Sequence, residues 1–322
     1  MKFRTEISIQ KPSFFLNHQH KILSIGSCFA DTIAEKLKHN KFQLLKNPFG
    51  NLFHPLAITK IIKFGIDVQQ KGYENAFIET NHTWLNYYFH SAIWDITKNN
   101  LQKKIEEKIS ILHQFIQKID ILMLTFGTAF IYEKNDNQQI VSNCHQQNPN
   151  IFTKKLLTIE TIIDDFETIY QSLKIINPSI KIILTVSPVR HSKEDLANDH
   201  LSKSILRVAT HILAEKYKDN IYYFPAFEIL NDDLRDYRFY KEDLIHPTLQ
   251  AENYVWQKFS SIFFDTSTQK IISDWNKIYH HLQHQPKNKN NPDYILLLEK
   301  TKKDLTTISQ YIDVKNEIEF FL

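Results

Sequence analysis

The sequence predicts an α/β protein of three layers, in which a mainly parallel sheet is covered by helices on both faces. Four short apolar runs, each typical of a buried strand, alternate with longer amphipathic patterns typical of helices. Strands joined through helices of this length lie parallel, because each connection must cross over the sheet. The chain has 322 residues, 42% of them hydrophobic, which is enough for a substantial core.

The first predicted strand is KILSIG, residues 21–26, and the helix after it places Phe29, Ile33 and Leu37 on one face. Each later strand follows a helical stretch. These strands are predicted over 118–127, 179–188 and 220–230. The last helix of the sheet region is predicted over 249–264.

The chain changes character near residue 265. The polar stretch QPKNKNNPD, residues 285–293, separates the preceding part from a final helical pattern over 294–312. We therefore predict one α/β domain over 1–265 and a helical extension packed on it over 266–322.

Composition excludes several classes of partner. The 39 basic and 36 acidic residues are well mixed and give a net charge of +3, so neither nucleic acid nor a membrane is expected as a partner. The N-terminus lacks a secretory signal, no apolar run approaches the roughly 20 residues of a membrane span, and the chain has two cysteines. We expect a cytoplasmic protein.

No metal or other cofactor is predicted. The 15 histidines form no His-Glu-x-x-His pattern, and no Cys-x-x-Cys is present. A dinucleotide-binding fold is disfavoured because Gly26 is not followed by further glycines at Gly-x-Gly-x-x-Gly spacing.

Four segments lie just beyond the predicted strands, and ligands of such sheets bind at the carboxyl ends of the strands. The segments are 26–30, 126–130, 187–191 and, after the last strand, 240–248. We expect them to converge on one site.

Ser27 and Cys28 stand side by side where the first strand gives way to a helix. The unpaired N–H groups and the dipole of a helix start lower the pKa of a thiol there and favour the nucleophilic thiolate. Position alone makes Ser27 a helix cap, with its hydroxyl as the alternative nucleophile. Cys28 is either the nucleophile or a small buried residue facing the sheet.

Asp243 and His246 lie three residues apart in the segment after the last strand. This spacing lets the carboxylate bind Nδ1 of the imidazole and leaves Nε2 free to take a proton from a thiol or hydroxyl. Asp-x-x-His alone is a weak pattern, and it gains weight from a sheet whose first strand ends in a nucleophile candidate.

The stretch IGSCFAD, residues 25–31, contains the motif after which the GSCFA domain family is named. Further blocks are similar to that family's pattern and occur in order. They are NPFGNLFHPLAI at 47–58, LTFGTAFIY at 124–132, NCH at 143–145, SPVRH at 187–191 and LRDYRFYKEDLIHPT at 234–248. The resemblance covers the chain to about residue 265, and it implies a place among the SGNH (GDSL-like) hydrolases, which are flavodoxin-like α/β esterases and acyl hydrolases.

The resemblance also implies roles for single residues. The SGNH motif Gly-Asp-Ser, laid without gaps on residues 26–28, gives Cys28 the place of the nucleophile. The motif Asp-x-x-His falls on Asp243 and His246. The resemblance thus implies a Cys-His-Asp triad.

The oxyanion-binding blocks match less completely. Gly50 is matched to the glycine whose N–H binds the oxyanion, and Gly127 to the glycine of the next block. Ala129 stands where that block has an asparagine, so we expect the Thr128 hydroxyl or Asn143 to supply the missing donor.

The predicted function is hydrolysis or acyl transfer on a small-molecule or glycan ester, for example an O-acyl or O-acetyl group of a carbohydrate. Arg190 follows a strand end and suits a substrate carboxylate or phosphate, with a surface ion pair as the alternative. Two other hypotheses stay open, namely a ligand-binding protein that has lost catalysis and a redox pair of Cys28 with Cys144. The sequence leaves the oligomeric state open.

Overall fold

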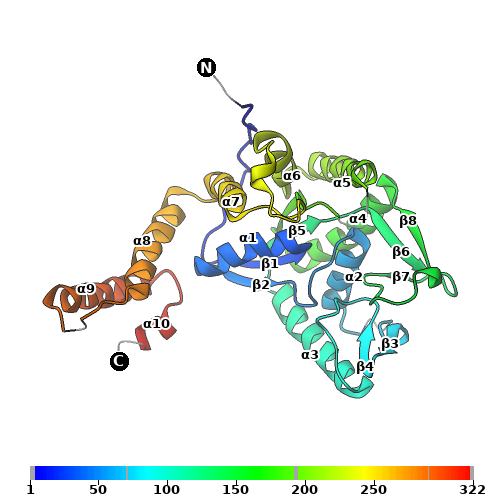
Figure 1. The fold of residues 1–322 in the computed structure, drawn as a ribbon, viewed down its shortest axis with the longest axis horizontal. Coiled ribbons are helices and arrows are strands. Elements are labelled where there is room, and N and C mark those ends of the chain that lie inside the picture. The colour runs from blue at the N-terminus through cyan, green and yellow to red at the C-terminus, as the bar shows by residue number, and fades with distance from the viewer. Residues whose placement is uncertain (1–3, 70–71, 192–194, 289, 320–322) are drawn as a thin grey trace.

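A parallel sheet of five strands forms the centre of the computed structural model, which describes residues 4–69, 72–191, 195–288 and 290–319 (Figure 1). In spatial order the strands are β10 (Ile221–Tyr223), β9 (Lys181–Val186), β5 (Ile121–Phe126), β1 (Lys21–Gly26) and β2 (Gln43–Lys46). When the five strands are numbered by their order in the chain and read from the β2 edge, they follow the 2-1-3-4-5 arrangement of flavodoxin-like doubly wound folds. The predicted α/β fold with a mainly parallel sheet is confirmed.

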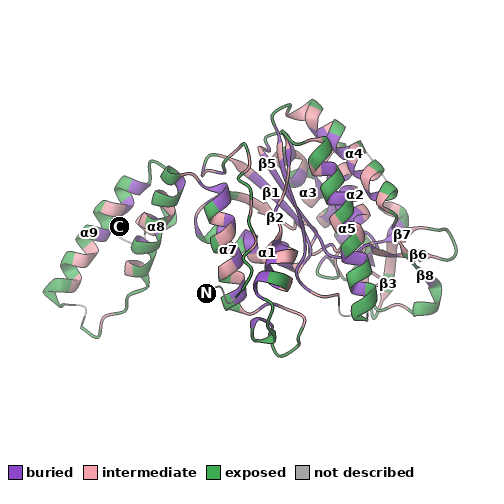
Figure 2. Ribbon diagram, turned by 90° about the horizontal axis from the view of Figure 1, so that it is seen from above, coloured by how far each residue is buried: buried purple, intermediate pink, exposed green. Residues whose placement is uncertain are grey.

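Helices cover both faces of this sheet, and the buried residues lie along the strands and on the helix sides that face them (Figure 2). One face packs against α1 (Cys28–His39) and α7 (Leu249–Phe263). The other packs against α2 (Pro55–Ile66), α3 (Lys98–Ile116), α4 (Ile159–Ile176) and α5 (Leu196–Lys216). Alternate residues of each central strand supply the two cores, because neighbouring side chains on a strand point to opposite faces.

The structure also contains elements that the sequence prediction lacked. β2 adds an edge strand beside β1. Two antiparallel additions follow, namely the hairpin of β3 (Phe77–Thr80) with β4 (Thr83–Asn86), and the sheet of β6 (Phe130–Lys134), β7 (Ile140–Val141) and β8 (Phe152–Leu156). The predicted strand over 220–230 is shorter than expected, because the chain turns into the short helix α6 (Ala226–Glu228) after β10.

The C-terminal part is helical and comprises α8 (Thr266–Gln283), α9 (Pro292–Ile308) and α10 (Lys315–Glu319). Figure 1 shows α8 and α9 beyond the sheet and its covering helices. The indole of Trp275 donates to the His39 carbonyl at 2.7 Å, and Lys41 pairs with Glu317 at 2.5 Å, so this part contacts the end of α1. In the described ranges, no helix is both long and apolar enough to cross a membrane.

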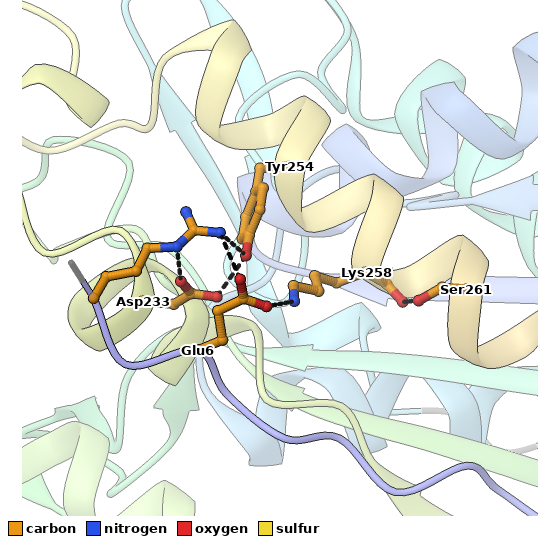
Figure 3. Close-up of polar contacts among 6 residues, drawn as sticks. Glu6, Asp233, Tyr254, Lys258 and Ser261 are labelled. Carbon is orange, nitrogen blue, oxygen red and sulfur yellow. Dashed lines mark hydrogen bonds and ion pairs between the residues drawn. The ribbon is translucent and has the colours of Figure 1, made fainter. Parts of the chain in front are cut away.

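A polar cluster joins the N-terminal segment to α7, the helix that follows Asp243 and His246 (Figure 3). Asp233 is bound by Arg4 Nε at 3.3 Å and by the Tyr254 hydroxyl at 2.7 Å, while Glu6 pairs with Lys258 at 3.1 Å. These contacts hold the turn at Ile229–Asp233 against α7.

Candidate functional site

A cavity of about 340 Å³ opens at the carboxyl ends of β1, β5 and β9. Its walls draw on all four segments at which the sequence predicted convergence, 26–30, 126–130, 187–191 and 240–248. The structure thus brings Cys28 and His246 to one cavity, as expected for a doubly wound sheet.

The turn out of β1 explains how the chain delivers Cys28 to this cavity. A Cβ on Gly26 would lie 2.3 Å from the Thr125 carbonyl oxygen of β5, so only glycine fits the close approach of the two strands. Ser27 then continues in extended backbone, and α1 begins at Cys28.

Burial raises the pKa of the Cys28 thiol. The charge of Lys203 and the N–H groups of Phe29 and Cys28 act in the opposite direction and are outweighed. The helix start therefore acts in the predicted direction, but burial outweighs it and the net shift of the pKa is upward, contrary to the prediction. Because the group rests as a thiol at neutral pH, nucleophilic attack by Cys28 requires a base.

Ser27 occupies the cap position of α1, but its hydroxyl caps nothing. The side chain makes no hydrogen bond to the first turn of the helix. Ser27 is 2% exposed and lines the cavity, and its buried Oγ has no hydrogen-bond partner among the residues that the structure describes. The predicted capping role is wrong, and the structure leaves a free hydroxyl beside Cys28.

Asp243 and His246 form the expected pair. Asp243 Oδ1 accepts the N–H groups of Ile245 and His246 at 2.9 and 3.0 Å, and Oδ2 binds His246 Nδ1 at 2.7 Å. The two backbone donors, followed by the imidazole, hold the pKa of Asp243 well below its usual range. An ionised Asp243 keeps the proton of the neutral imidazole on Nδ1 and leaves Nε2 as the acceptor.

The base and the nucleophile candidates share the cavity. His246 lines it with a side chain 43% exposed. In the part of the chain that the structure describes, no hydrogen bond joins its imidazole to Cys28 or Ser27. Hydrogen bonds of this kind are often long before substrate binds.

Two glycines predicted to bind an oxyanion do not offer a free N–H. The N–H of Gly50 donates to the Asn47 carbonyl at 2.8 Å, and Gly50 does not line the cavity. Gly127 lines it, but its N–H donates to the Phe53 carbonyl at 2.7 Å. These two oxyanion roles do not fit the geometry, because both N–H groups are used in holding the backbone.

The two side chains considered as replacement donors differ in their freedom. The Thr128 hydroxyl lies 3.0 Å from Ser202 Oγ and accepts the Phe130 N–H at 3.1 Å. Asn143 accepts the His145 N–H through Oδ1 at 2.8 Å, which identifies the oxygen end of the amide. Its Nδ2 makes no hydrogen bond within the described residues, so Asn143 is the better donor for a ligand in the cavity.

Arg190 lines the cavity, but other groups already hold its guanidinium. Nη1 donates to the Leu244 carbonyl at 2.9 Å, and the guanidinium lies 4.4 Å from the centre of the Tyr240 ring. Arg190 thereby ties the loop after β9 to the loop that carries His246. Its predicted contact with a substrate anion stays a prediction.

Sequence reasoning missed two buried titratable residues. His54 lies in the cavity wall, accepts the Ala57 N–H at Nδ1 and reaches the Val141 carbonyl through Nε2. Burial lowers its pKa to about 4, so it is neutral at pH 7. Lys203 lies beneath the cavity on α5 and is 1% exposed. The signal for Lys203 is its place on the stripe of α5 that also carries the buried Leu206.

Cys144 also lines the cavity, and no disulfide joins it to Cys28. No group of three or more His, Cys, Asp or Glu side chains within the described ranges is arranged to hold a metal ion.

Comparison with known proteins gives a family match and several distant structural likenesses. A search of curated proteins returns no match. A carbohydrate esterase family 3 structure from Talaromyces cellulolyticus is 14% identical, with 49% of this chain and 62% of that one covered and a TM-score of 0.29. A mutant acetyl esterase with acetate ion is 11% identical, with 79% and 99% covered and a TM-score of 0.35.

A third structure, from Streptococcus pneumonia, is provisionally described as a platelet activating factor. It is 14% identical, with 79% of this chain and 86% of that one covered and a TM-score of 0.37. The GSCFA family model matches residues 21–259, which include every segment that builds the cavity. The chain belongs to the GSCFA family.

Proposed function

We propose that the protein is an SGNH-like ester hydrolase or acyltransferase with Cys28 as nucleophile, His246 as base and Asp243 as the residue that orients the base. The observation that carries the proposal is the common cavity of Cys28 and His246, with Asp243 bound 2.7 Å from Nδ1. A thiol at the start of a helix, an imidazole with a free Nε2 and an ionised carboxylate are the parts that acyl transfer needs.

The proposed reaction has two steps. His246 Nε2 takes the thiol proton as the Cys28 sulfur attacks the ester carbonyl, and the oxyanion intermediate collapses as the C–O bond breaks. The same imidazole gives its proton to the departing alcohol, which leaves a thioester on Cys28. Water, or an acceptor hydroxyl, then attacks this thioester with His246 again as base, and the product acid or new ester leaves the free thiol.

The Asn143 amide is the proposed donor to the oxyanion. Its Oδ1 is held by the His145 N–H, so the free Nδ2 is oriented by the backbone rather than by solvent. A donor fixed before the reaction contributes more than one that must reorient, because no reorganisation is needed as charge develops.

The cavity suggests a small acyl group. Its volume of about 340 Å³ lies near the lower end of small-molecule sites. Phe53, Val189 and Ile245 line it and provide apolar contacts for an acyl chain. We propose an O-acyl or O-acetyl ester of a carbohydrate or related metabolite as the substrate.

The test is capture of the acyl-enzyme. The protein is mixed with p-nitrophenyl acetate at neutral pH, release of nitrophenol is followed, and the acetylated residue is located by peptide mass spectrometry. We expect one acetyl group on Cys28 in the wild type, none in Cys28→Ala, and slow acetylation in His246→Ala.

Two outcomes contradict the proposal. Acetylation of Ser27 would transfer the nucleophile's role to the neighbouring hydroxyl. Reaction of Cys28 no faster than that of Cys144, and unchanged in His246→Ala, would indicate a generic thiol and favour a ligand-binding protein that has lost catalysis.

A further inference from the structure

The ammonium of Lys203 is buried under the cavity and binds three backbone carbonyls. Nζ donates to the oxygens of Gly127 at 2.6 Å, Ser187 at 2.9 Å and Val189 at 2.9 Å. An ammonium has three protons, so these carbonyls account for its whole donor capacity. All three acceptors belong to residues that line the cavity.

These bonds connect separate parts of the site. Gly127 follows β5, whereas Ser187 and Val189 follow β9. The neighbouring Ser202 binds the same loop after β5, because its Oγ accepts the Ala129 N–H at 2.7 Å. One turn of α5 therefore holds both strand-end loops together below the reacting groups.

The charge of Lys203 also acts on the nucleophile candidate. Lys203 lowers the pKa of Cys28, and Cys28 in turn raises that of Lys203. The carboxylate of Asp199, 4% exposed and one turn earlier on α5, raises the pKa of Lys203 as well. Other titratable groups that line the cavity are His54, Tyr132, Cys144, His191 and His246, and Asp31 also acts on Cys28.

We infer that Lys203 is a positioning residue of the proposed acyl-transfer site, which clamps the loops after β5 and β9 and places a buried positive charge against the wall of the cavity that Cys28 lines. The inference rests on the proposed function and deepens it. The charge stabilises the thiolate that forms when His246 removes the proton, while the clamp fixes the loops that surround the sulfur.

The charge has a defined pH range. Burial lowers the pKa of Lys203 to about 8. Lys203 is therefore charged at neutral pH and becomes neutral above pH 8 or so, and its effect on the thiol is present below that value and lost above it. A purely structural lysine would not give its neighbour such a pH dependence.

The test measures the rate at which iodoacetamide alkylates Cys28 in a Cys144→Ser background, from neutral to alkaline pH. We expect Lys203→Met to slow alkylation at neutral pH by a factor on the order of ten, because one nearby charge shifts a pKa by about one unit. The two rates should converge above about pH 8, where the wild-type lysine loses its charge. Lys216→Met is the matched control, since it removes an exposed lysine from the same helix.

Asp199→Asn provides a second variant if Lys203→Met does not fold. The amide oxygen can still accept the His191 N–H, which Asp199 Oδ1 binds at 3.2 Å, but the charge that favours the ammonium is gone. We expect the rate of Cys28 alkylation to lose its dependence on Lys203 at a lower pH than in the wild type.

The inference is overturned if folded Lys203→Met reacts like the wild type at neutral pH, or is slowed by one constant factor at every pH. An unchanged profile in Asp199→Asn overturns it as well. Alkylation requires no acyl-enzyme, so failure of the proposed function is distinguishable: Cys28 would then keep its Lys203-dependent profile and never carry an acetyl group.

Discussion

The nucleophile side of the cavity is buried and anchored from beneath, whereas the base side is an exposed loop held by local bonds. On the first side, Lys203 and Ser202 of α5 bind the loops after β5 and β9. On the second, Asp243 and His246 each have side chains 43% exposed and bind mainly each other. We therefore expect substitutions on the buried side to change the stability of the fold, and substitutions on the exposed side to change proton transfer alone.

The base loop nevertheless has a fixed shape. Leu244 adopts a positive φ of 55°, and the Lys241 N–H donates to the His246 carbonyl at 2.8 Å. The Arg190 bond to Leu244 holds the middle of this loop, and the polar cluster of Figure 3 joins Asp233, before the loop, to α7, after it. Since backbone bonds hold the loop while the imidazole is exposed, the fold does not depend on the His246 side chain.

The largest expected effect is on the base side. His246→Ala should reduce kcat/KM for ester hydrolysis by a factor of about 10³ or more, because the thiol loses the group that accepts its proton. The free energy of unfolding should change by less than about 0.5 kcal/mol, as for exposed sites generally. Steady-state kinetics and urea unfolding measure the two effects, with His211→Ala on the exposed side of α5 as control.

A stable but fully active His246→Ala protein would remove the base from the mechanism. A large loss of stability would contradict the comparison, because the base loop would then support the fold.

Asp243→Asn should give a smaller loss of activity at unchanged stability. The amide would donate to Nδ1, stabilise the opposite tautomer and place a proton on Nε2, where an acceptor is needed. We expect kcat to fall by roughly 10², because an imidazole in the wrong tautomer still acts as a base in a fraction of the molecules. The ionised state of Asp243 matters here, since its pKa is held low and the acid side of the activity profile should not follow its titration. A variant with unchanged kcat would show that His246 needs no orienting carboxylate.

The buried side should instead respond to pH. The pKa of His54 in the folded protein is about 4, against 6.5 for the free group, so the unfolded chain binds the extra proton first. The contribution of neutral His54 to the free energy of unfolding is therefore fully present above pH 6.5 and is lost as the pH falls from there through 4. The total loss is roughly 3 kcal/mol for this group.

His54→Asn tests this sign, because an asparagine can still cap α2 but does not titrate. Urea unfolding of both proteins at neutral and acidic pH should give a wild-type free energy that falls more steeply with acid. Parallel curves would mean that His54 is not buried in neutral form.

The same contrast shows what could be predicted from the sequence. The strand ends and their convergence were predictable, because apolar periodicity marks the strands and a doubly wound sheet brings their carboxyl ends together. Asp243 and His246 were predictable for a related reason: their pairing is local and depends on a spacing of three residues. β2 was missed because its four residues are partly exposed and carry no buried run.

The buried side could not be predicted in the same way, since its bonds join residues distant in sequence. The N–H of Gly127 is taken by Phe53, and the ammonium of Lys203 by carbonyls of two loops. A lysine on an apolar helix face signals burial without naming its partners. The sign of the Cys28 pKa shift depends on the same packing, because burial outweighs the helix start.

The smallest expected effect concerns Ser27, and it separates the two adjacent nucleophile candidates. The Ser27 hydroxyl is buried and has no partner within the described part of the chain, so Ser27→Ala should raise the free energy of unfolding by up to about 1 kcal/mol. Ser202→Ala is the matched control, because that hydroxyl is also buried but bonded, and its loss should cost about 1–3 kcal/mol.

Ester hydrolysis should fall less than tenfold in Ser27→Ala, in contrast to its loss in Cys28→Ala. Loss of hydrolysis in Ser27→Ala, with Cys28→Ala still active, would make the hydroxyl the nucleophile. A destabilised Ser27→Ala protein would show that the hydroxyl has a partner in solution.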